Sequence, residues 1–372
     1  MIKVFASKTG QEEIDEVIST LQSQWLGIGS KVTTFEKELA ERNKFKSVVM
    51  TDSCSNSLYT AINCFRFPPG SEIILPSLTF VSCAHAVVLN NCVPVFCDVE
   101  YDSMNCSLET ITKHITPKTA AIMVVHYGGK PVNIGPILEL GLPVIEDAAC
   151  AIDSKIGDQY CGSFGDIGCF SFDSMKNLSA GEGGAIVAAS TSMIEKVKRL
   201  RYSGIAKSGI DAAKEHKGRW WETEVLYASI RQMPNDIIAS VALAQLRKLD
   251  QLQLVRKTIW DIYQREFENI QDLIRPVNAG NNEQHSYFTY AIKVPYINDS
   301  VNRDKLAYFL YDRGIYTTLR YYPIHYMKLY ETHKCLQNTE KLNEEALSLP
   351  IHPDLSDTDI DKIVSAVKEF FK

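Results

Sequence analysis

The sequence lacks long apolar runs, an excess of positive charge and any internal repeat or low-complexity segment. No run is long enough to span a membrane and the first residues lack the apolar core of a signal peptide, so we expect a cytoplasmic protein with no membrane partner. A net charge of −6 and a pI of about 5.8 give no electrostatic reason to expect a nucleic-acid partner. An anionic small ligand would therefore need a local binding site.

Closely spaced metal-ligand pairs are missing as well. None of the ten cysteines belongs to a C-x2-C pair, and no cysteine and histidine have the spacing of a zinc site, so no metal site is predicted. Most of the cysteines lie inside apolar runs, which favours buried free thiols in a reducing compartment.

With 372 residues, 45% of them hydrophobic and 23% charged, the chain has an ordinary globular composition and is long enough for two domains. Its central part alternates short apolar runs with helical segments. Runs that are apolar on both faces and separated by helices predict an α/β fold with a mostly parallel seven-stranded sheet covered on both sides. The seven strand candidates are 47–50, 72–75, 94–96, 120–125, 143–145, 169–172 and 184–188.

Helical periodicity marks the segments on either side of the predicted sheet. Apolar residues at helical spacing predict a surface helix over 11–24. Residues 236–272 contain neither glycine nor proline and keep the same periodicity, so one long or kinked helical region should lead to the C-terminal part. That part alternates strand-like and helical runs, which predicts a large domain over 1–250 and a small α+β domain over 251–372.

Parallel sheets bind ligands at the carboxyl ends of their strands, and several predicted strands are followed there by polar or aromatic residues. The first strand leads into Ser53, Cys54 and Ser55 at a helix start, where free amides and the helix dipole favour an anion such as phosphate. Ordinary N-capping explains these three residues as well and is preferred for the motif alone. Phe80 and His126 follow two other strands, and each by itself fits a structural role better.

Two ionisable residues lie at the same predicted edge. Asp147 follows a buried strand, where a carboxylate needs a partner; a protonated pyridine nitrogen and a capped helix are equally good explanations. Lys176 lies on a short loop between two predicted strands, where partial desolvation would favour the neutral, nucleophilic amine. Taken alone, the stretch Gly168–Gly184 fits a surface lysine in a turn better.

Together these parts are the set that pyridoxal phosphate needs. The set comprises a lysine for a covalent link to the aldehyde, a carboxylate for the ring nitrogen, an aromatic ring for stacking and an anion site. All four follow successive strands of one predicted sheet, which favours one shared site over four unrelated structural residues.

Motifs throughout the chain support the same interpretation. The three strongest are Glu146-Asp147-Ala148-Ala149, Ser171-Phe172 followed by Lys176, and Gly181-Glu182-Gly183-Gly184. Supporting motifs are Trp25-Leu26-Gly27-x-Gly29, Pro76-x2-Thr79-Phe80, Val125-His126, Met233 with Ala244-Gln245-Leu246, Tyr322-Pro323-x-His325 and Leu349-Pro350. In this order and spacing, over nearly the whole chain, the sequence resembles the DegT/DnrJ/EryC1/StrS aminotransferases, sugar aminotransferases of the fold type I pyridoxal-phosphate class.

The resemblance implies a role for each matching residue. Lys176 matches the lysine that bonds to pyridoxal phosphate and later moves a proton between substrate and cofactor. Asp147 matches the partner of the pyridine nitrogen, and Phe80 matches the aromatic side chain stacked on the ring. The residues that match the phosphate site are Ser53, Cys54, Ser55 and Ser171. The residues that lie where relatives approach the sugar nucleotide are His325, Tyr322, Arg231 and the basic segment 207–231.

The sequence departs from the family pattern at three cofactor positions. Cys54 replaces a glycine that is common in relatives, and Cys150 replaces a glutamine that commonly reaches the phenolic oxygen of the cofactor. Ile230 replaces an asparagine that crosses the dimer to the phosphate. Asn235 and Arg231 are alternative substitutes for that asparagine, and the sequence does not choose between them.

The resemblance implies a homodimer that moves an amino group, with L-glutamate as donor, onto a keto carbon of a nucleotide-linked sugar in two half-reactions through pyridoxamine phosphate. The expected acceptor is a 4-keto-6-deoxy hexose, for surface polysaccharide or a glycosylated metabolite. The alternatives are another keto sugar such as a 3-keto sugar or keto sugar acid, a cyclitol, or a non-catalytic ligand-binding regulatory protein. Lys176, where related dehydratases have histidine, argues against dehydration.

Overall fold

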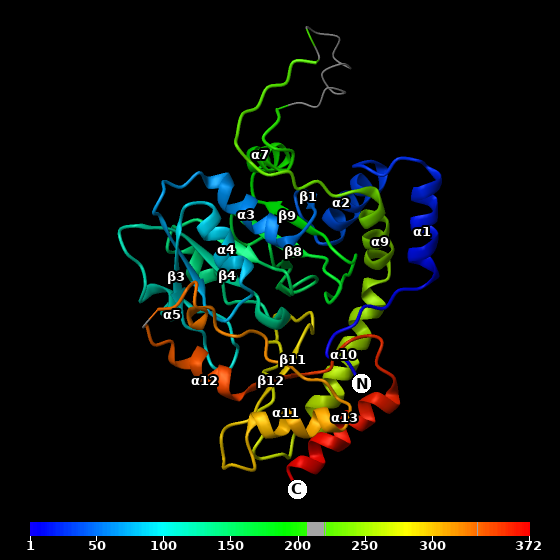
Figure 1. Cartoon of the computed structure of the whole chain (residues 1–372), viewed down its shortest axis with the longest axis vertical. Coiled ribbons are helices and arrows are strands. Elements are labelled where there is room, and N and C mark those ends of the chain that lie inside the picture. The colour runs from blue at the N-terminus through cyan, green and yellow to red at the C-terminus, as the bar shows by residue number, and fades with distance from the viewer. Residues whose placement is uncertain (207–218, 220, 333) are drawn as a thin grey trace.

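The computed structural model describes residues 1–206, 219, 221–332 and 334–372, so much of the predicted 207–231 segment lies outside the described residues. A seven-stranded sheet with strand order β1-β9-β8-β5-β4-β2-β3 forms its centre (Figure 1). All seven predicted strands are confirmed: β1 (Val48–Thr51), β2 (Glu72–Pro76), β3 (Val93–Cys97), β4 (Thr119–Val125), β5 (Val144–Asp147), β8 (Ile167–Ser171) and β9 (Gly184–Ala188).

The sheet is mostly parallel, as predicted. Strands β3, β2, β4, β5 and β8 pair in parallel, whereas β9 is antiparallel to both β8 and β1. The chain returns from β8 to β9 through residues 172–183 without a crossover helix, which only an antiparallel pair allows. This loop carries Lys176 and places it at the edge where the parallel strands end.

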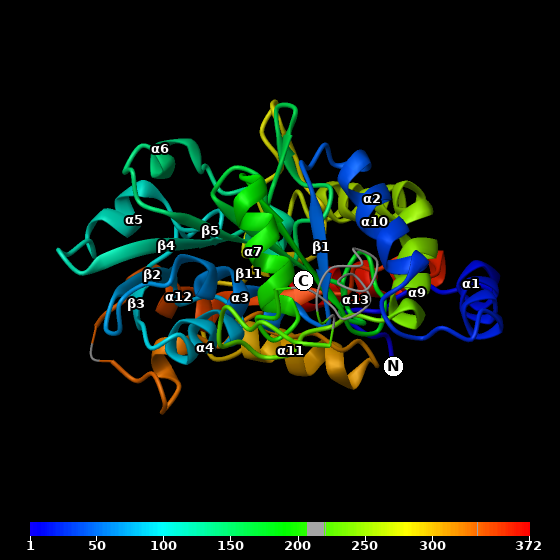
Figure 2. The ribbon, with the colours of Figure 1, turned by 90° about the horizontal axis from the view of Figure 1, so that it is seen from above.

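Alternate strand residues contribute to two cores on opposite faces of the sheet. Figure 2 shows the sheet strands and the helices around them from above. In β1, Val49 belongs to one core, whereas Val48 and Met50 belong to the other. The helices of the first core are α3 (Cys54–Phe65), α4 (Ser82–Leu89) and α7 (Thr191–Arg201), and those of the second are α2 (Ser30–Arg42) and α9 (Asp236–Arg247). The predicted covering of both faces is therefore confirmed.

Helix α1 (Gln11–Gln22) confirms the predicted N-terminal surface helix, and its apolar residues point outward. Ile14, Ile18 and Leu21 are 52%, 45% and 52% exposed. Buried Glu13 instead faces the protein and accepts a hydrogen bond of 2.6 Å from the Gln245 amide of α9. Polar contacts thus hold α1 on the large sheet unit, and its apolar stripe lies on the outer surface.

The predicted connecting region consists of two consecutive helices, α9 and α10 (Leu249–Glu266), which meet at Lys248. Beyond them, an antiparallel strand pair packs with α10 and two further helices around a separate core. The elements of this unit are β11 (Tyr290–Lys293), β12 (Ala346–Leu349), α11 (Arg303–Asp312) and α13 (Asp357–Phe370). Leu342 of α12 (Gln337–Glu345) belongs to a different cluster, with Leu78 and Val99. The α+β content agrees with expectation, and the division at residue 250 stays a prediction.

The remaining elements are short. They are α5 (Leu108–Thr112), α6 (Gly135–Leu138), the 3₁₀ turns η1 (Tyr127–Gly129) and η2 (Ile324–Tyr326), and a small sheet of β6 (Lys155–Ile156), β7 (Gln159–Tyr160) and β10 (Glu283–Gln284). All ten cysteines are free thiols. Within the described ranges, no helix combines the length and the hydropathy that a membrane crossing needs, and no side-chain cluster could hold a metal ion.

One buried histidine makes the stability of this fold depend on pH. His285 packs between Trp260 and Tyr287, with ring centroids 4.9 and 5.1 Å away, and its Nδ1 accepts a hydrogen bond from the Tyr287 backbone amide at 2.6 Å. Burial, together with the charge of Lys130, lowers the pKa of His285 to about 3. The imidazole therefore stays neutral in the folded protein throughout mild acid.

We expect this histidine to weaken the fold as the pH falls below its unfolded pKa of about 6.5. Only the unfolded chain then binds the extra proton, which costs about 2 kcal/mol at pH 5 relative to pH 7. His285→Asn keeps an acceptor for Tyr287 and cannot titrate. Urea titrations should show the unfolding free energy of the variant falling about 2 kcal/mol less than that of the parent between pH 7 and pH 5. Equal losses in both proteins would contradict the prediction.

Candidate active site

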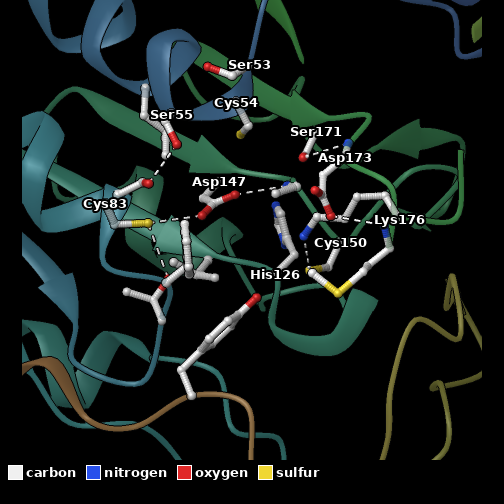
Figure 3. Close-up of a pocket in the computed structure, with 18 of the residues that line it drawn as sticks. Ser53, Cys54, Ser55, Cys83, His126, Asp147, Cys150, Ser171, Asp173 and Lys176 are labelled. Carbon is white, nitrogen blue, oxygen red and sulfur yellow. Dashed lines mark hydrogen bonds between the residues drawn. The ribbon is translucent and has the colours of Figure 1, made fainter. Parts of the chain in front are cut away.

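A cavity of about 320 Å³ opens at the edge of the sheet where the parallel strands end (Figure 3). The ends of β4, β5 and β8, the start of α3 and the loop before β9 all contribute residues to it. The predicted residues that line the cavity are Ser53, Cys54, Ser55, Phe80, Asp147, Cys150, Ser171 and Lys176. The fold therefore brings together the whole predicted cofactor set except Asn235.

The start of α3 forms a polar wall of this cavity. Ser53 caps the helix and accepts a hydrogen bond from the Asn56 amide at 3.2 Å, so the capping interpretation is confirmed. Capping does not exclude anion binding, because the first amides of a helix have no acceptor within the helix. Ser55 Oγ lies 2.7 Å from Ser82 Oγ, which orients both hydroxyls. Gly184 allows the start of β9 to approach, since a Cβ there would lie 2.5 Å from the Ser53 carbonyl carbon.

Asp147 ends β5 as a carboxylate that is only 5% exposed. One oxygen accepts a hydrogen bond from the Ala149 amide at 2.9 Å, and the other accepts one from the Cys83 thiol at 3.0 Å. Burial and the charge of Asp147 raise the pKa of Cys83, so its sulfur keeps the proton that it donates. No helix follows Asp147, which rules out the helix-capping alternative. Within the described part of the chain no cationic side chain lies within ion-pair distance of this carboxylate.

Lys176 lies in the loop between β8 and β9, and its side chain points back toward the cavity (Figure 3). Its ammonium donates to the Cys150 sulfur at 3.3 Å and lies 4.8 Å from the ring centroid of Phe288. A backbone bond from the Lys176 amide to the Asp173 carbonyl fixes the turn. The alternative of an ordinary surface lysine is therefore wrong.

The charge state expected for Lys176 needs correction. Burial by itself lowers the pKa of this amine, as predicted, but Cys150, Tyr321 and Asp147 favour the ammonium and shift the pKa upward overall. Sequence reasoning placed Asp147 and Cys150 at the same site but considered only desolvation of the amine, and it did not anticipate Tyr321. Without a ligand in the cavity, Lys176 is therefore a cation at neutral pH.

Phe80 lines the cavity and is 52% exposed, so the alternative of a core residue is wrong. Its ring centroid lies 5.8 Å from that of Tyr321, at an interplanar angle of 52°. Two other predicted residues also line the cavity. Ser171 ends β8, and Cys150 lies in the segment after β5. A flat aromatic ligand would thus have one side chain for stacking and a ring of polar groups around it.

Four predicted residues do not line the cavity. Asn235 caps α9 and accepts a hydrogen bond from the Ile238 amide at 2.9 Å, and Arg231 is exposed with its guanidinium 5.4 Å from the Tyr202 ring centroid. From these positions they would act only at the cavity of a second copy, which stays a prediction. The other two residues are His325 and Tyr322.

His325 is buried, with Nδ1 2.6 Å from Ser77 Oγ and Nε2 3.5 Å from Glu340. These contacts tie η2 to the segment after β2. Tyr322 is 52% exposed and packs near Tyr326, with ring centroids 5.9 Å apart. The cavity gives no support to a direct substrate contact from either residue, and their predicted roles stay predictions.

His126 has the structural role that is usual for a lone histidine after a strand. It is fully buried, and its Nδ1 accepts a hydrogen bond from the Val132 amide at 3.0 Å. Nε2 therefore carries the proton and donates to Glu146 at 2.9 Å. Glu146 also accepts from the amides of Gly162 and Gly165, so this buried carboxylate is fully paired.

Sequence reasoning missed several cavity residues. Arg320 and Tyr321 come from the segment after α11, more than a hundred residues beyond Lys176, and no local pattern connects the two segments. The available signal was an arginine inside an aromatic run, Leu319-Arg320-Tyr321-Tyr322. Cys83 lies in a mostly apolar helical stretch, where the sequence gives no sign of a role in the site. Other unpredicted lining residues are Thr79, Ser82, Tyr127, Asp173, Met175 and Glu182.

Comparison with known proteins decides the family. The sequence model of the DegT/DnrJ/EryC1/StrS aminotransferase family matches residues 7–368. The chain belongs to this family. It is therefore a pyridoxal-phosphate-dependent aminotransferase, and the resemblance seen in the sequence is confirmed.

Relatives match over nearly their whole length. The dTDP-4-dehydro-2,3,6-trideoxy-D-glucose 4-aminotransferase of Saccharopolyspora spinosa is 34% identical, over 97% of this chain and 94% of the relative. The spore coat polysaccharide biosynthesis protein SpsC of Bacillus subtilis is 32% identical, over 98% and 95%. The crystal structure of the aminotransferase TlmJ from Streptoalloteichus hindustanus superposes with a TM-score of 0.91 at 33% identity, covering 100% of this chain and 98% of that one.

The cavity of this family member fits pyridoxal phosphate. Asp147 is a buried carboxylate without a cationic partner among the described side chains, which is the environment that a protonated ring nitrogen would complete. The amides and hydroxyls at the start of α3 suit a phosphate. Lys176 and Phe80 line the same cavity and contribute an amine and an aromatic face.

We expect the ammonium form of Lys176 to limit capture of the cofactor at neutral pH. Only the neutral amine attacks an aldehyde, and its fraction rises about tenfold per pH unit below a raised pKa. Stopped-flow mixing of cofactor-free protein with pyridoxal phosphate should therefore show a rate that climbs steeply from pH 7 to pH 9. Cys150→Ala removes the sulfur that accepts a hydrogen bond from the ammonium and should react faster at pH 7. A rate that does not change with pH would contradict this account.

Proposed function

We propose that this aminotransferase moves an amino group from L-glutamate onto a keto carbon of a nucleotide-linked sugar. The observation that carries the proposal is the cavity that joins Lys176, the buried Asp147 carboxylate and the polar start of α3 at one sheet edge. The acceptor class is inferred from the named activity of the Saccharopolyspora spinosa relative, which aminates position 4 of a dTDP-linked keto sugar.

A 4-keto-6-deoxy hexose is the preferred acceptor. Relatives that match over their full length include a 4-aminotransferase of a 6-deoxygenated sugar nucleotide and a spore coat polysaccharide biosynthesis protein. An amino sugar for surface polysaccharide or another glycoconjugate fits both. Another keto sugar, a keto sugar acid or a cyclitol remains the alternative acceptor, and a regulatory protein without activity is disfavoured by the intact pair of Lys176 and Asp147.

The cavity residues divide the chemistry between them. When bound, the cofactor supplies a conjugated ring that takes up the electron pair of the C–H bond broken in the donor. Asp147 would keep a proton on the ring nitrogen, with its own position fixed by Ala149 and Cys83. Lys176 Nζ would carry the proton to and from the reacting carbon, and Phe80 would cover one face of the ring and exclude water.

Cys150 and the polar wall complete the binding set. The thiol of Cys150 contacts Lys176 at 3.3 Å and holds the amine beside the segment after β5. Ser53, Ser55 and Ser171 would hold the phosphate together with the free amides at the start of α3. Cys54 contributes its backbone amide at the first position of this helix, where its side chain adds little to anion binding.

We further propose that the enzyme works as a homodimer in the cytoplasm. Three apolar residues of α1 face outward, and the following Trp25 and Leu26 extend this surface with 55% and 46% exposure. Ile230, also exposed, occupies the position from which relatives send an asparagine into the neighbouring subunit. A second copy of the chain is the partner that would both cover this surface and bring Asn235 or Arg231 to the cavity.

The double variant Ile14→Lys/Ile18→Lys should disrupt this dimer, because two charges would be buried in an apolar contact. Light scattering after size-exclusion chromatography should give a dimer for the parent and the chain mass of 41.8 kDa for the variant. Tyr308→Lys on α11 is the control, since Tyr308 is 71% exposed and far from α1 in the fold. A monomeric parent protein, or an unchanged dimer in the double variant, counts against the proposal.

The visible absorbance of the bound cofactor tests the proposed activity. Purified protein with pyridoxal phosphate should be yellow, should be trapped by borohydride and should bleach with L-glutamate. Keto-sugar nucleotides offered to the bleached protein should restore the colour only when they are acceptors, so a panel of them identifies the sugar, the nucleotide and the carbon. Lys176→Ala should fold and give no borohydride-trapped product, whereas Lys37→Ala on the exposed face of α2 should behave as the parent. Failure of the parent protein to bind the cofactor would reject the proposal.

A further inference from the structure

Arg320 brings a positive charge to the cavity, and among the described residues no acidic side chain balances it. It lines the cavity, and its guanidinium lies 4.1 Å from the ring centroid of Phe5 and 5.1 Å from that of Phe288. Its polar partners are the Tyr321 hydroxyl at 3.2 Å and the Met175 sulfur at 3.4 Å. In the described part of the chain, no carboxylate comes within ion-pair distance of this guanidinium.

The surroundings of Arg320 leave its strongest bonding capacity unused. A guanidinium has five N–H donors in one plane, and stacking over an aromatic ring uses its face and not these donors. A neutral hydroxyl and a thioether are weak partners compared with a carboxylate, which a guanidinium binds through two parallel charge-assisted bonds. The cavity therefore presents the guanidinium of Arg320, with its planar set of N–H donors, to an anionic ligand.

The position of Arg320 relative to Lys176 indicates which anion it meets. The Lys176 ammonium lies 4.8 Å from the centroid of Phe288, the same ring that Arg320 covers at 5.1 Å, so both cations lie around one side chain. In an amino acid, the carbon that loses its amino group is bonded directly to the carboxylate. If the reacting carbon of the donor lies beside Lys176, its carboxylate is therefore expected near Arg320.

The other anions of the reaction fit this position less well. A cofactor phosphate has its own site at the start of α3, with the Ser53 and Ser55 hydroxyls and free amides. The keto carbon of a neutral sugar carries no charge, and its diphosphate is separated from that carbon by the sugar ring. Only the amino donor places an anion next to the reacting carbon.

We propose that Arg320 binds the α-carboxylate of the amino donor and so selects α-amino acids over other amines. This inference rests on the proposed aminotransferase function. Arg320 is a substrate-binding and specificity residue in this account, and Tyr321 orients it through the hydroxyl contact. The proton transfer itself stays with Lys176.

The amino donor takes part only in the first half-reaction, so measuring the two half-reactions separately distinguishes donor binding from the binding of the other ligands. Arg320→Gln removes the charge, and we expect the apparent second-order rate constant for bleaching of the yellow holoenzyme by L-glutamate to fall at least about 30-fold. Colour recovery of the pyridoxamine form with the accepted keto-sugar nucleotide should stay within about threefold of the parent. Spectral titration with 2-methyl-L-glutamate, which has no α-hydrogen to lose, should show the same loss as an equilibrium affinity.

Comparison of donors identifies the carboxylate. L-Glutamine keeps the α-carboxylate and lacks the distal one, so Arg320→Gln should slow bleaching by glutamine as much as by glutamate. A loss restricted to glutamate would assign Arg320 to the distal carboxylate and overturn the proposal. Arg313→Gln is the matched control, because this arginine also stacks on an aromatic ring, 3.4 Å from the Phe309 centroid, but pairs with Glu369 outside the cavity.

Other results overturn the inference in distinguishable ways. Unchanged bleaching by glutamate shows that Arg320 does not bind the donor, and weakened cofactor retention or sugar recovery assigns it to a phosphate. If Arg320→Gln does not fold, Arg320→Lys keeps the charge without the fork, and a donor half-reaction as fast as the parent's then rejects the proposal. A parent protein that binds cofactor but bleaches with no amino acid rejects the proposed function itself and not this assignment alone.

Discussion

The buried carboxylate of Asp147 is the constraint on which the site depends. A carboxylate with 5% exposure and two hydrogen bonds from neutral donors is costly to keep charged in a protein interior. A backbone amide and a thiol nevertheless fix this carboxylate. Its remaining capacity to accept hydrogen bonds faces the cavity. A cationic ring nitrogen would be the partner that turns this unfavourable arrangement into a favourable one, so we expect cofactor binding and fold stability to be coupled.

The antiparallel strand β9 solves the problem of placing an amine opposite that carboxylate. In a purely parallel sheet the chain would leave the end of β8 through a helix and begin the next strand at the opposite edge. Because β9 runs back beside β8, the loop of Lys176 stays at the edge where β5 ends with Asp147. The close contact of Gly184 with the Ser53 turn then joins the amine loop to the start of α3.

Most of the sheet and the cofactor set could be predicted from the sequence, because both depend on local patterns. Apolar runs on both faces fix the strands; Asp147 ends its strand, and Phe80 and Lys176 follow theirs within a few residues. The direction in which α1 faces could not be predicted, since an apolar stripe looks the same whether the protein or a partner covers it. The charge state of Lys176 also escaped prediction, because it depends on Cys150 and Tyr321 from distant segments.

The substrate side of the cavity was the least predictable, for a physical reason. The cofactor side is built by strand ends of one sheet, whose order follows from the fold, whereas Arg320 and Tyr321 come from an extended segment that reaches the cavity only through packing of the second unit. Such a segment can change its side chains without disturbing the sheet. Relatives can therefore share Lys176 and Asp147 and still differ in donor and acceptor, and the residues around Arg320 are where that difference should be sought.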